Sequence, residues 1–67
     1  MRFLLNNREE ESVMDVLSVS DLLELKKYTF RMRIIKINGT LISKDEYDST
    51  IIRDGDNVQI IYLMSGG

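Results

Sequence analysis

The sequence predicts an α+β domain in which one helix crosses one face of a mixed sheet of four to five strands. Several short runs of alternating apolar residues, bounded by turn signals, are typical of strands. A single stretch, residues 18–28, has apolar residues at helical spacing. The strongest turn signal, Asn38-Gly39, joins two of the runs that resemble strands. With 67 residues the chain has room for one hydrophobic core.

The first two predicted strands form a hairpin. Residues 1–5 place Met1, Phe3 and Leu5 on one face, and Asn6-Asn7 supplies the turn because Asn tolerates a positive φ. The return strand, about residues 8–14, begins with a nearly all-polar run. The acidic residues 9–11 suit a solvent-facing edge strand whose charges oppose edge-to-edge pairing. A metal or partner site is the alternative for this acidic run.

The helix is predicted to begin after Ser18 and to end near Tyr28. Ser18 and Asp21 form an approximate capping box, with Asp where Glu is usual. The buried stripe consists of Val19, Leu22 and Leu23, completed by Tyr28 or the stem of Lys26. The next strand, residues 32–37, is expected to turn Ile35 and Ile37 inward and Lys36 outward.

The chain after Asn38-Gly39 is expected to form a short strand at residues 40–42, a helical turn at 43–47 and a return to the core at 48–52. Asp54-Gly55-Asp56 is interpreted as a turn, since the residues that follow lack the oxygen ligands of a calcium loop. The four methionines are scattered along the sequence and are expected to fill the core.

The final strand, residues 57–63, has apolar residues on both faces and is therefore expected in the middle of the sheet. Val58, Ile60, Tyr62 and Met64 share one face, while Gln59, Ile61 and Leu63 share the other. If the first face packs on the helix, then Ile61 and Leu63 lie on the far face with Ile34 and the stem of Lys36. Such an exposed apolar patch is typical of a partner surface. Ordinary surface apolarity is the alternative.

Composition excludes several classes of function. The chain has neither Cys nor His, which excludes disulfides, Cys/His zinc sites and catalytic triads built on these residues. The net charge of −2 argues against nucleic acid, and no apolar run is long enough to span a membrane. No signal peptide is evident, so we expect a cytoplasmic protein. A core this small has little room for a concave active site, and we do not expect an enzyme.

The sequence ends on Gly66-Gly67 directly after the final strand. We expect a folded domain at residues 1–65 and a flexible tail at 66–67, because glycine has no side chain to pack. The hypothesis is that the domain presents this tail and that the Gly67 carboxylate is the site of the chemistry. A frayed terminus without function is the alternative.

Taken in this order, these features resemble the ubiquitin-like β-grasp sulfur carriers, and most closely the ThiS family of thiamine biosynthesis. The resemblance includes an Asn at the first turn, Ser18-Val19-x-Asp21-Leu22-Leu23, Ile37-Asn38-Gly39, Asp54-Gly55-Asp56 and the terminal Gly66-Gly67. The motif that begins at Ser18 resembles the Thr-Val-x-x-Leu-Leu sequence with which the helix begins in the family. Three departures affect the expected geometry of residues 8–17: Asn7 replaces a Gly, the second strand is unusually acidic, and the proline before the helix is missing.

The resemblance implies a carrier protein that binds no cofactor. An E1-like adenylating enzyme would use ATP and magnesium to activate the Gly67 carboxylate, with Gly66 providing reach. A cysteine desulfurase would supply sulfur, and the resulting thiocarboxylate would serve thiazole synthase. The residues implied in partner binding are Ile34, Lys36, Ile61, Leu63, Met64 and Ser65. The alternatives are a small subunit of the molybdopterin-synthase type, a protein-conjugating modifier, and a ubiquitin-like binding module whose Gly-Gly is incidental.

Overall fold

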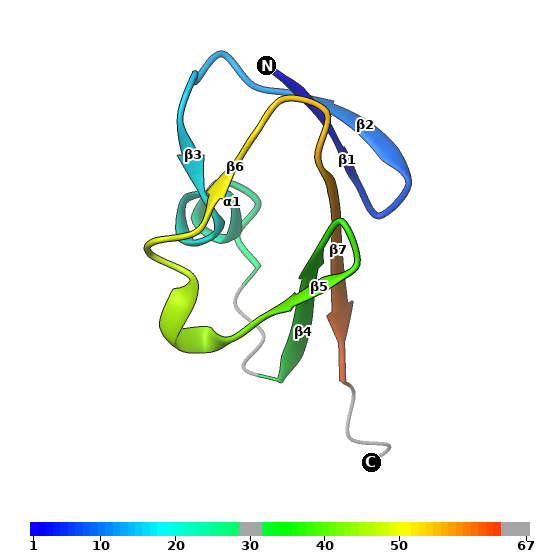
Figure 1. The fold of residues 1–67 in the computed structure, drawn as a ribbon, viewed down its shortest axis with the longest axis vertical. Helices are drawn as coiled ribbons and strands as arrows, with labels where there is room; N and C mark the ends of the chain where they lie inside the picture. Colours follow the sequence, from blue (N-terminus) through cyan, green and yellow to red (C-terminus); the bar gives the residue numbers. More distant parts are fainter. Residues whose placement is uncertain (29–31, 64–67) are drawn as a thin grey trace.

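A computed structural model describes residues 1–28 and 32–63, which form two sheets, one α-helix and one 3₁₀ turn (Figure 1). The larger sheet has five strands in the order β2-β1-β7-β4-β5, and β3 pairs with β6 in a separate two-stranded sheet. The elements are β1 (Arg2–Leu5), β2 (Arg8–Glu11), β3 (Leu17–Ser18), α1 (Val19–Leu25), β4 (Arg33–Ile37), β5 (Thr40–Ile42), the 3₁₀ turn η1 (Lys44–Glu46), β6 (Ile51–Ile52) and β7 (Asn57–Tyr62).

The predicted architecture is confirmed. The larger sheet is mixed, because β1 and β7 are parallel whereas β1–β2, β4–β5 and β4–β7 are antiparallel. In Figure 1, α1 is seen nearly end-on beside one face of this sheet, next to β3 and β6. No helix within residues 1–28 and 32–63 is long and apolar enough to cross a bilayer.

The core lies between α1 and the inner face of the larger sheet. Alternation along each strand turns Phe3 and Leu5 inward from β1, Ile35 and Ile37 from β4, and Val58 and Ile60 from β7. The helix contributes the predicted stripe, and the other elements close the core with Leu17, Tyr47 and Ile52. The remaining buried residues are Val19, Leu22 and Leu23.

The predicted capping box is present at the start of α1. The Asp21 N–H donates to Ser18 Oγ at 3.0 Å, and the Ser18 N–H donates to Asp21 Oδ2 at 3.1 Å. The predicted end near Tyr28 is wrong, because α1 ends at Leu25. Lys27 adopts a positive φ of 56°, and its N–H donates to the Glu24 carbonyl while the Tyr28 N–H donates to that of Leu23. This pair of bonds is a Schellman motif, which stops a helix.

The first hairpin is shorter than predicted, since β2 ends at Glu11 and does not reach residue 14. Its last pair is Arg2 with Glu11, and beyond it the Ser12 N–H donates to the Met1 carbonyl at 2.9 Å while the Met1 ammonium donates to the Ser12 carbonyl at 2.8 Å. The Met14 N–H then donates to Ser12 Oγ at 3.1 Å, which turns the chain away. Asn6 and Asn7, both at positive φ, form the expected two-residue turn.

The methionines do not all fill the core. Met1 packs against it, but Met14 and Met32 are exposed, and Met64 lies outside the described residues. Met14 lies on the connection between β2 and β3. No local sequence pattern predicts the path of this connection across the surface.

The turn before β7 uses its own carboxylates. Asp56 accepts the Arg53 N–H at 2.8 Å through Oδ2 and the Asn38 Nδ2 at 2.9 Å through Oδ1, while Asp54 Oδ1 accepts the Arg2 N–H. Gly55 has a φ of 86°, which favours glycine. The interpretation of this segment as a turn is therefore correct. The two aspartates of the turn also connect it to Arg2 and Asn38, which lie in neighbouring segments.

Candidate functional site

The candidate site is built on β7, which leads to the C-terminal glycines. β7 lies between β1 and β4 at the centre of the larger sheet, as predicted. It pairs with the whole of β4, from Arg33 opposite Tyr62 to Ile37 opposite Val58. The Leu63 N–H donates to the Met32 carbonyl at 2.9 Å, so the pairing extends to the last residue described at this end.

Asn6 secures the other edge of β7. Its Nδ2 donates to the Ile60 carbonyl at 3.2 Å, and its Oδ1 accepts the Ile60 N–H at 2.8 Å. The Asn6 N–H also donates to the Val58 carbonyl at 2.9 Å. The side chain thus continues the ladder where β1 has turned away, and β7 is hydrogen-bonded on both edges. Because β7 is held on both edges, the chain leaves the sheet from a fixed position at the end of this strand.

The outer sheet face consists of side chains of β4, β5 and β7 that point away from α1, namely Ile34, Lys36, Leu41, Gln59 and Ile61. Ile34 is paired with Ile61, and Lys36 lies between Gln59 and Leu41. The same alternation adds Met32 and Leu63 to this face. Ile61 is 46% exposed and Leu63 is 45% exposed, although both are large apolar residues. No described element covers this face (Figure 1).

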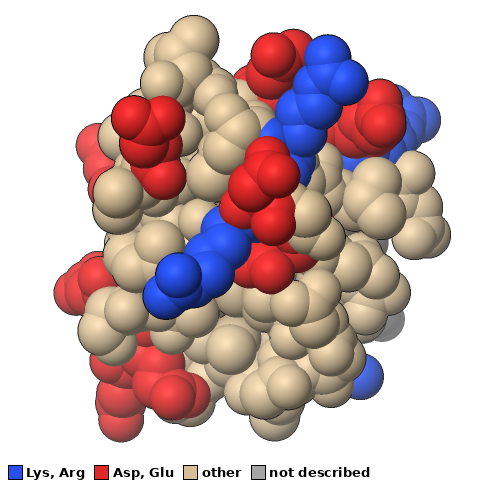
Figure 2. Space-filling view, turned by 45° about the horizontal axis from the view of Figure 1, so that its top comes forward, with Lys and Arg blue, Asp and Glu red and all other residues tan. Residues whose placement is uncertain are grey.

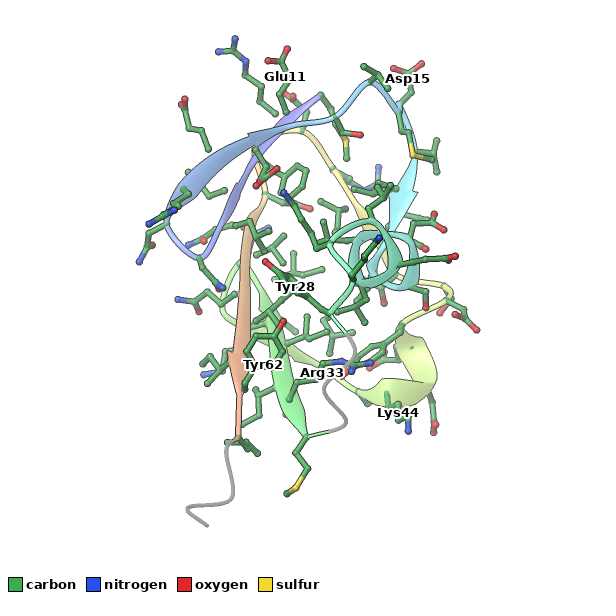
Figure 3. The ribbon with its side chains drawn as sticks, turned by 180° about the vertical axis from the view of Figure 1, so that it is seen from behind. Glu11, Asp15, Tyr28, Arg33, Lys44 and Tyr62 are labelled. Atoms are coloured by element: carbon green, nitrogen blue, oxygen red, sulfur yellow. The ribbon has the colours of Figure 1, made fainter. Side chains whose placement is uncertain are left out.

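The inner side of the same end of β7 is aromatic. Tyr62 meets Tyr28 edge to face, with the ring centroids 5.6 Å apart, and the two rings point toward one another in Figure 3. Arg33, opposite Tyr62 on β4, lies 5.3 Å from the centre of the Tyr47 ring. Burial raises the pKa of the Tyr62 phenol, and Tyr28 adds to this effect. The first contact attaches the end of the sheet to the segment that follows α1, and the second attaches it to the residue that follows η1.

The structure brings together four of the residues predicted to bind a partner, namely Ile34, Lys36, Ile61 and Leu63. The other predicted site residues, Met64, Ser65, Gly66 and Gly67, lie outside the described residues.

Sequence reasoning missed one member of the outer sheet face, Leu41, although a signal for it was present. A two-residue turn at Asn38-Gly39 sets the hairpin register, which places Leu41 beside Lys36. Alternation along residues 32–37 correctly predicted that Met32 lies on the same side as Ile34 and Lys36.

A mixed five-stranded sheet crossed by one helix, with the last strand at its centre, defines the ubiquitin-like β-grasp class. The family model of the ThiS family matches residues 2–67, and the chain belongs to that family.

Two solved structures are similar over the whole chain. One is the crystal structure of the thiamine biosynthesis protein ThiS from Geobacter metallireducens, with a TM-score of 0.88 and 28% identity, covering 100% of both chains. The other is a solution structure of a thiamine biosynthesis protein from the same organism, with a TM-score of 0.81 and 28% identity, covering 100% of this chain and 88% of that one. No curated protein matches the chain at a significant level.

Proposed function

We propose that this protein is a sulfur carrier whose terminal Gly67 carboxylate is converted to a thiocarboxylate for thiazole formation in thiamine biosynthesis. The observation that carries the proposal is the match to the ThiS family over residues 2–67, which includes Gly66 and Gly67. The similar structures from Geobacter metallireducens are of thiamine biosynthesis proteins, which favours the thiamine pathway over molybdopterin synthesis. In this role the chain is a substrate of its partner enzymes and not itself a catalyst.

The chemistry starts from a carboxylate, which is a poor electrophile at neutral pH. An E1-like adenylating enzyme, with its own ATP and magnesium, joins a Gly67 oxygen to the α-phosphorus and releases pyrophosphate. A persulfide sulfur from a cysteine desulfurase then attacks the carbonyl carbon, and AMP leaves. A second thiol attacks the desulfurase sulfur of the resulting acyl disulfide, forms a new disulfide with that cysteine and frees the thiocarboxylate, which thiazole synthase uses. We propose that these steps take place in the cytoplasm, where ATP is available.

The outer sheet face is the surface that we propose for docking these partners. Its apolar pairs, Ile34 with Ile61 and Met32 with Leu63, lie at the end of β7 from which the chain continues to the tail. All of these residues except the half-buried Ile34 are exposed. Lys36 adds a cation to the same face. In this arrangement Met64 and Ser65 connect the docked face to the glycines, which have no side chains to obstruct a narrow active site.

The test of the tail chemistry is intact mass spectrometry after incubation with an adenylating partner, ATP and a sulfur donor. We expect a gain that matches replacement of one oxygen by sulfur, and deletion of Gly67 should abolish it. No gain with a partner that is active on another carrier would refute the proposal. A chain that retains its cellular role without Gly67 would instead be a binding module.

Docking is tested separately by a matched pair of variants. Ile61→Ser removes an apolar side chain that is 46% exposed on the outer sheet face, whereas Ile51→Ser removes one that is 37% exposed on β6. Burying half of an Ile side chain contributes about 1 kcal/mol, so kcat/KM of the adenylating partner should fall about fivefold with Ile61→Ser. Equal effects of the two variants would exclude this face as the docking surface.

A further inference from the structure

A second apolar surface lies away from the outer sheet face, where the β2–β3 connection meets α1. Four large apolar residues are exposed along this part of the chain, namely Val13, Met14, Val16 and Leu25. Leu25 is 60% exposed, although it lies one helical turn after the buried Leu22. The helix therefore presents an apolar side chain beyond the stripe that the core requires.

Leu25 forms a ridge between two shallow grooves. Met14, Asp21, Glu24 and Leu25 line one of them, and we call these four residues the helix–loop patch. The other groove lies on the far side of Leu25, where the core residues Phe3, Leu17 and Leu22 form its apolar part and Glu10, Glu11, Ser12 and Lys26 complete its lining. An apolar side chain from outside could contact Leu25 from either groove.

The charge of the helix–loop patch is negative. Asp21 and Glu24 line the groove, and within residues 1–28 and 32–63 neither forms an ion pair. Of the two cations that follow α1, Lys26 is bound to Glu10 at 2.7 Å, and Lys27 lines a different groove together with Glu24. Asp15 adds a further carboxylate on the β2–β3 connection, above β3 and α1 in Figure 3. Figure 2 shows Asp and Glu side chains at several places on one face of the molecule, with Lys and Arg side chains between some of them.

The two apolar surfaces therefore differ in charge. The outer sheet face has Lys36 at its centre, whereas the helix–loop patch has two carboxylates beside Met14 and Leu25. Surfaces of opposite charge select different partners, because like charges brought together at an interface oppose binding.

We propose that the helix–loop patch binds a cationic amphipathic segment of a partner protein other than the one on the outer sheet face. An apolar side chain of that segment packs between Met14 and Leu25, and its Lys or Arg residues face Asp21 and Glu24. An anionic membrane surface would be repelled by the same carboxylates. A second copy of this chain would join the helix–loop patch to the Lys36 face, which is a heterologous contact that builds a ring or an open filament and not a two-fold dimer.

The test is a titration of the full-length, ¹⁵N-labelled protein with a synthetic peptide that has Leu at helical spacing and Lys elsewhere. We expect saturable amide shifts at Met14, Asp21, Glu24 and Leu25, and weaker binding as salt screens the charges. A peptide with Glu in place of Lys should not bind. The experiment involves no tail chemistry, so its result is independent of whether Gly67 carries sulfur.

A matched pair of variants locates the binding. Leu25→Ser should weaken binding of the Leu/Lys peptide about tenfold, since it removes apolar contact without changing the charge. Leu41→Ser, at a residue 62% exposed on the outer sheet face compared with 60% for Leu25, should leave the affinity unchanged. Glu24→Lys, an exposed charge reversal, should weaken binding severalfold and provides a second variant if Leu25→Ser is poorly folded.

Four results would overturn the proposal. These are no saturable shift, shifts centred on Ile34 and Ile61, equal effects of Leu25→Ser and Leu41→Ser, and equal binding of the Glu peptide. Shifts that appear on dilution of the protein alone, at both surfaces, would make a second copy the occupant and would also overturn it.

Discussion

The hydrogen bonds from Asn6 to Ile60 are expected to stabilise the domain measurably, and Asn6→Gly removes them. Each of the two bonds, at 2.8 and 3.2 Å, contributes about 0.5–1.5 kcal/mol net, so their loss should cost about 1–3 kcal/mol. Glycine accepts the φ of 51° at this position, so backbone strain does not confuse the result. A 67-residue domain has about 3–10 kcal/mol of stability in total, and the loss is therefore a large fraction.

Urea unfolding followed by circular dichroism measures this effect, with Asn7→Gly as the matched control. Asn7 belongs to the same turn at a φ of 68° but takes no part in the bonds to Ile60. With an m-value of about 1 kcal/mol/M, Asn6→Gly should lower the midpoint by about 1–3 M relative to Asn7→Gly. Hydrogen exchange at the Ile60 amide should accelerate in the first variant alone. Equal midpoints and equal exchange would refute this account of how β7 is held.

Three further predictions concern the helix and the aromatic contact. Lys27→Gly should raise the free energy of unfolding by about 0.5–1 kcal/mol in thermal unfolding, because Lys27 has a φ of 56°; a lower Tm would contradict this. Ser18→Ala should lower the free energy by about 0.5–2 kcal/mol through loss of the bond to the Asp21 N–H, and an unchanged value in urea would show that the cap is not needed. Burial raises the Tyr62 pKa, so the folded chain keeps this proton to higher pH than the unfolded chain, and stability should fall as the pH rises above about 10. Tyr62→Phe should remove a component with a raised pKa from an ultraviolet titration, and an unchanged curve would contradict the assignment.

The parts of the fold that could be predicted from the sequence are those set by neighbouring residues. Ser18 and Asp21 are three residues apart, and Asn38-Gly39 determines its turn by itself. Alternation was also enough to divide the residues of β4 and β7 correctly between the two faces. The outer sheet face was therefore largely predictable, including Leu41 and Met32, which follow from the same rules.

The features that were missed depend on distant contacts or on unusual backbone geometry. Leu17 and Ser18 form β3 only because Ile52 and Ile51 lie alongside them. The early end of α1 depends on a positive φ at Lys27, and Lys has no intrinsic preference for that conformation. The helix–loop patch arises where the β2–β3 connection passes α1, and nothing in the local sequence brings Met14 to Leu25.

Because β7 lies at the centre of the larger sheet, the domain can fold only when the chain extends through this last strand. β7 is the only strand that joins β1 and β2 to β4 and β5 in the described larger sheet. A chain cut before Asn57 would be left with two separate two-stranded ribbons, which are marginally stable in water at best. Such a fragment would remain unfolded and open to proteolysis, so partners that recognise the folded sheet would encounter only molecules that have retained β7.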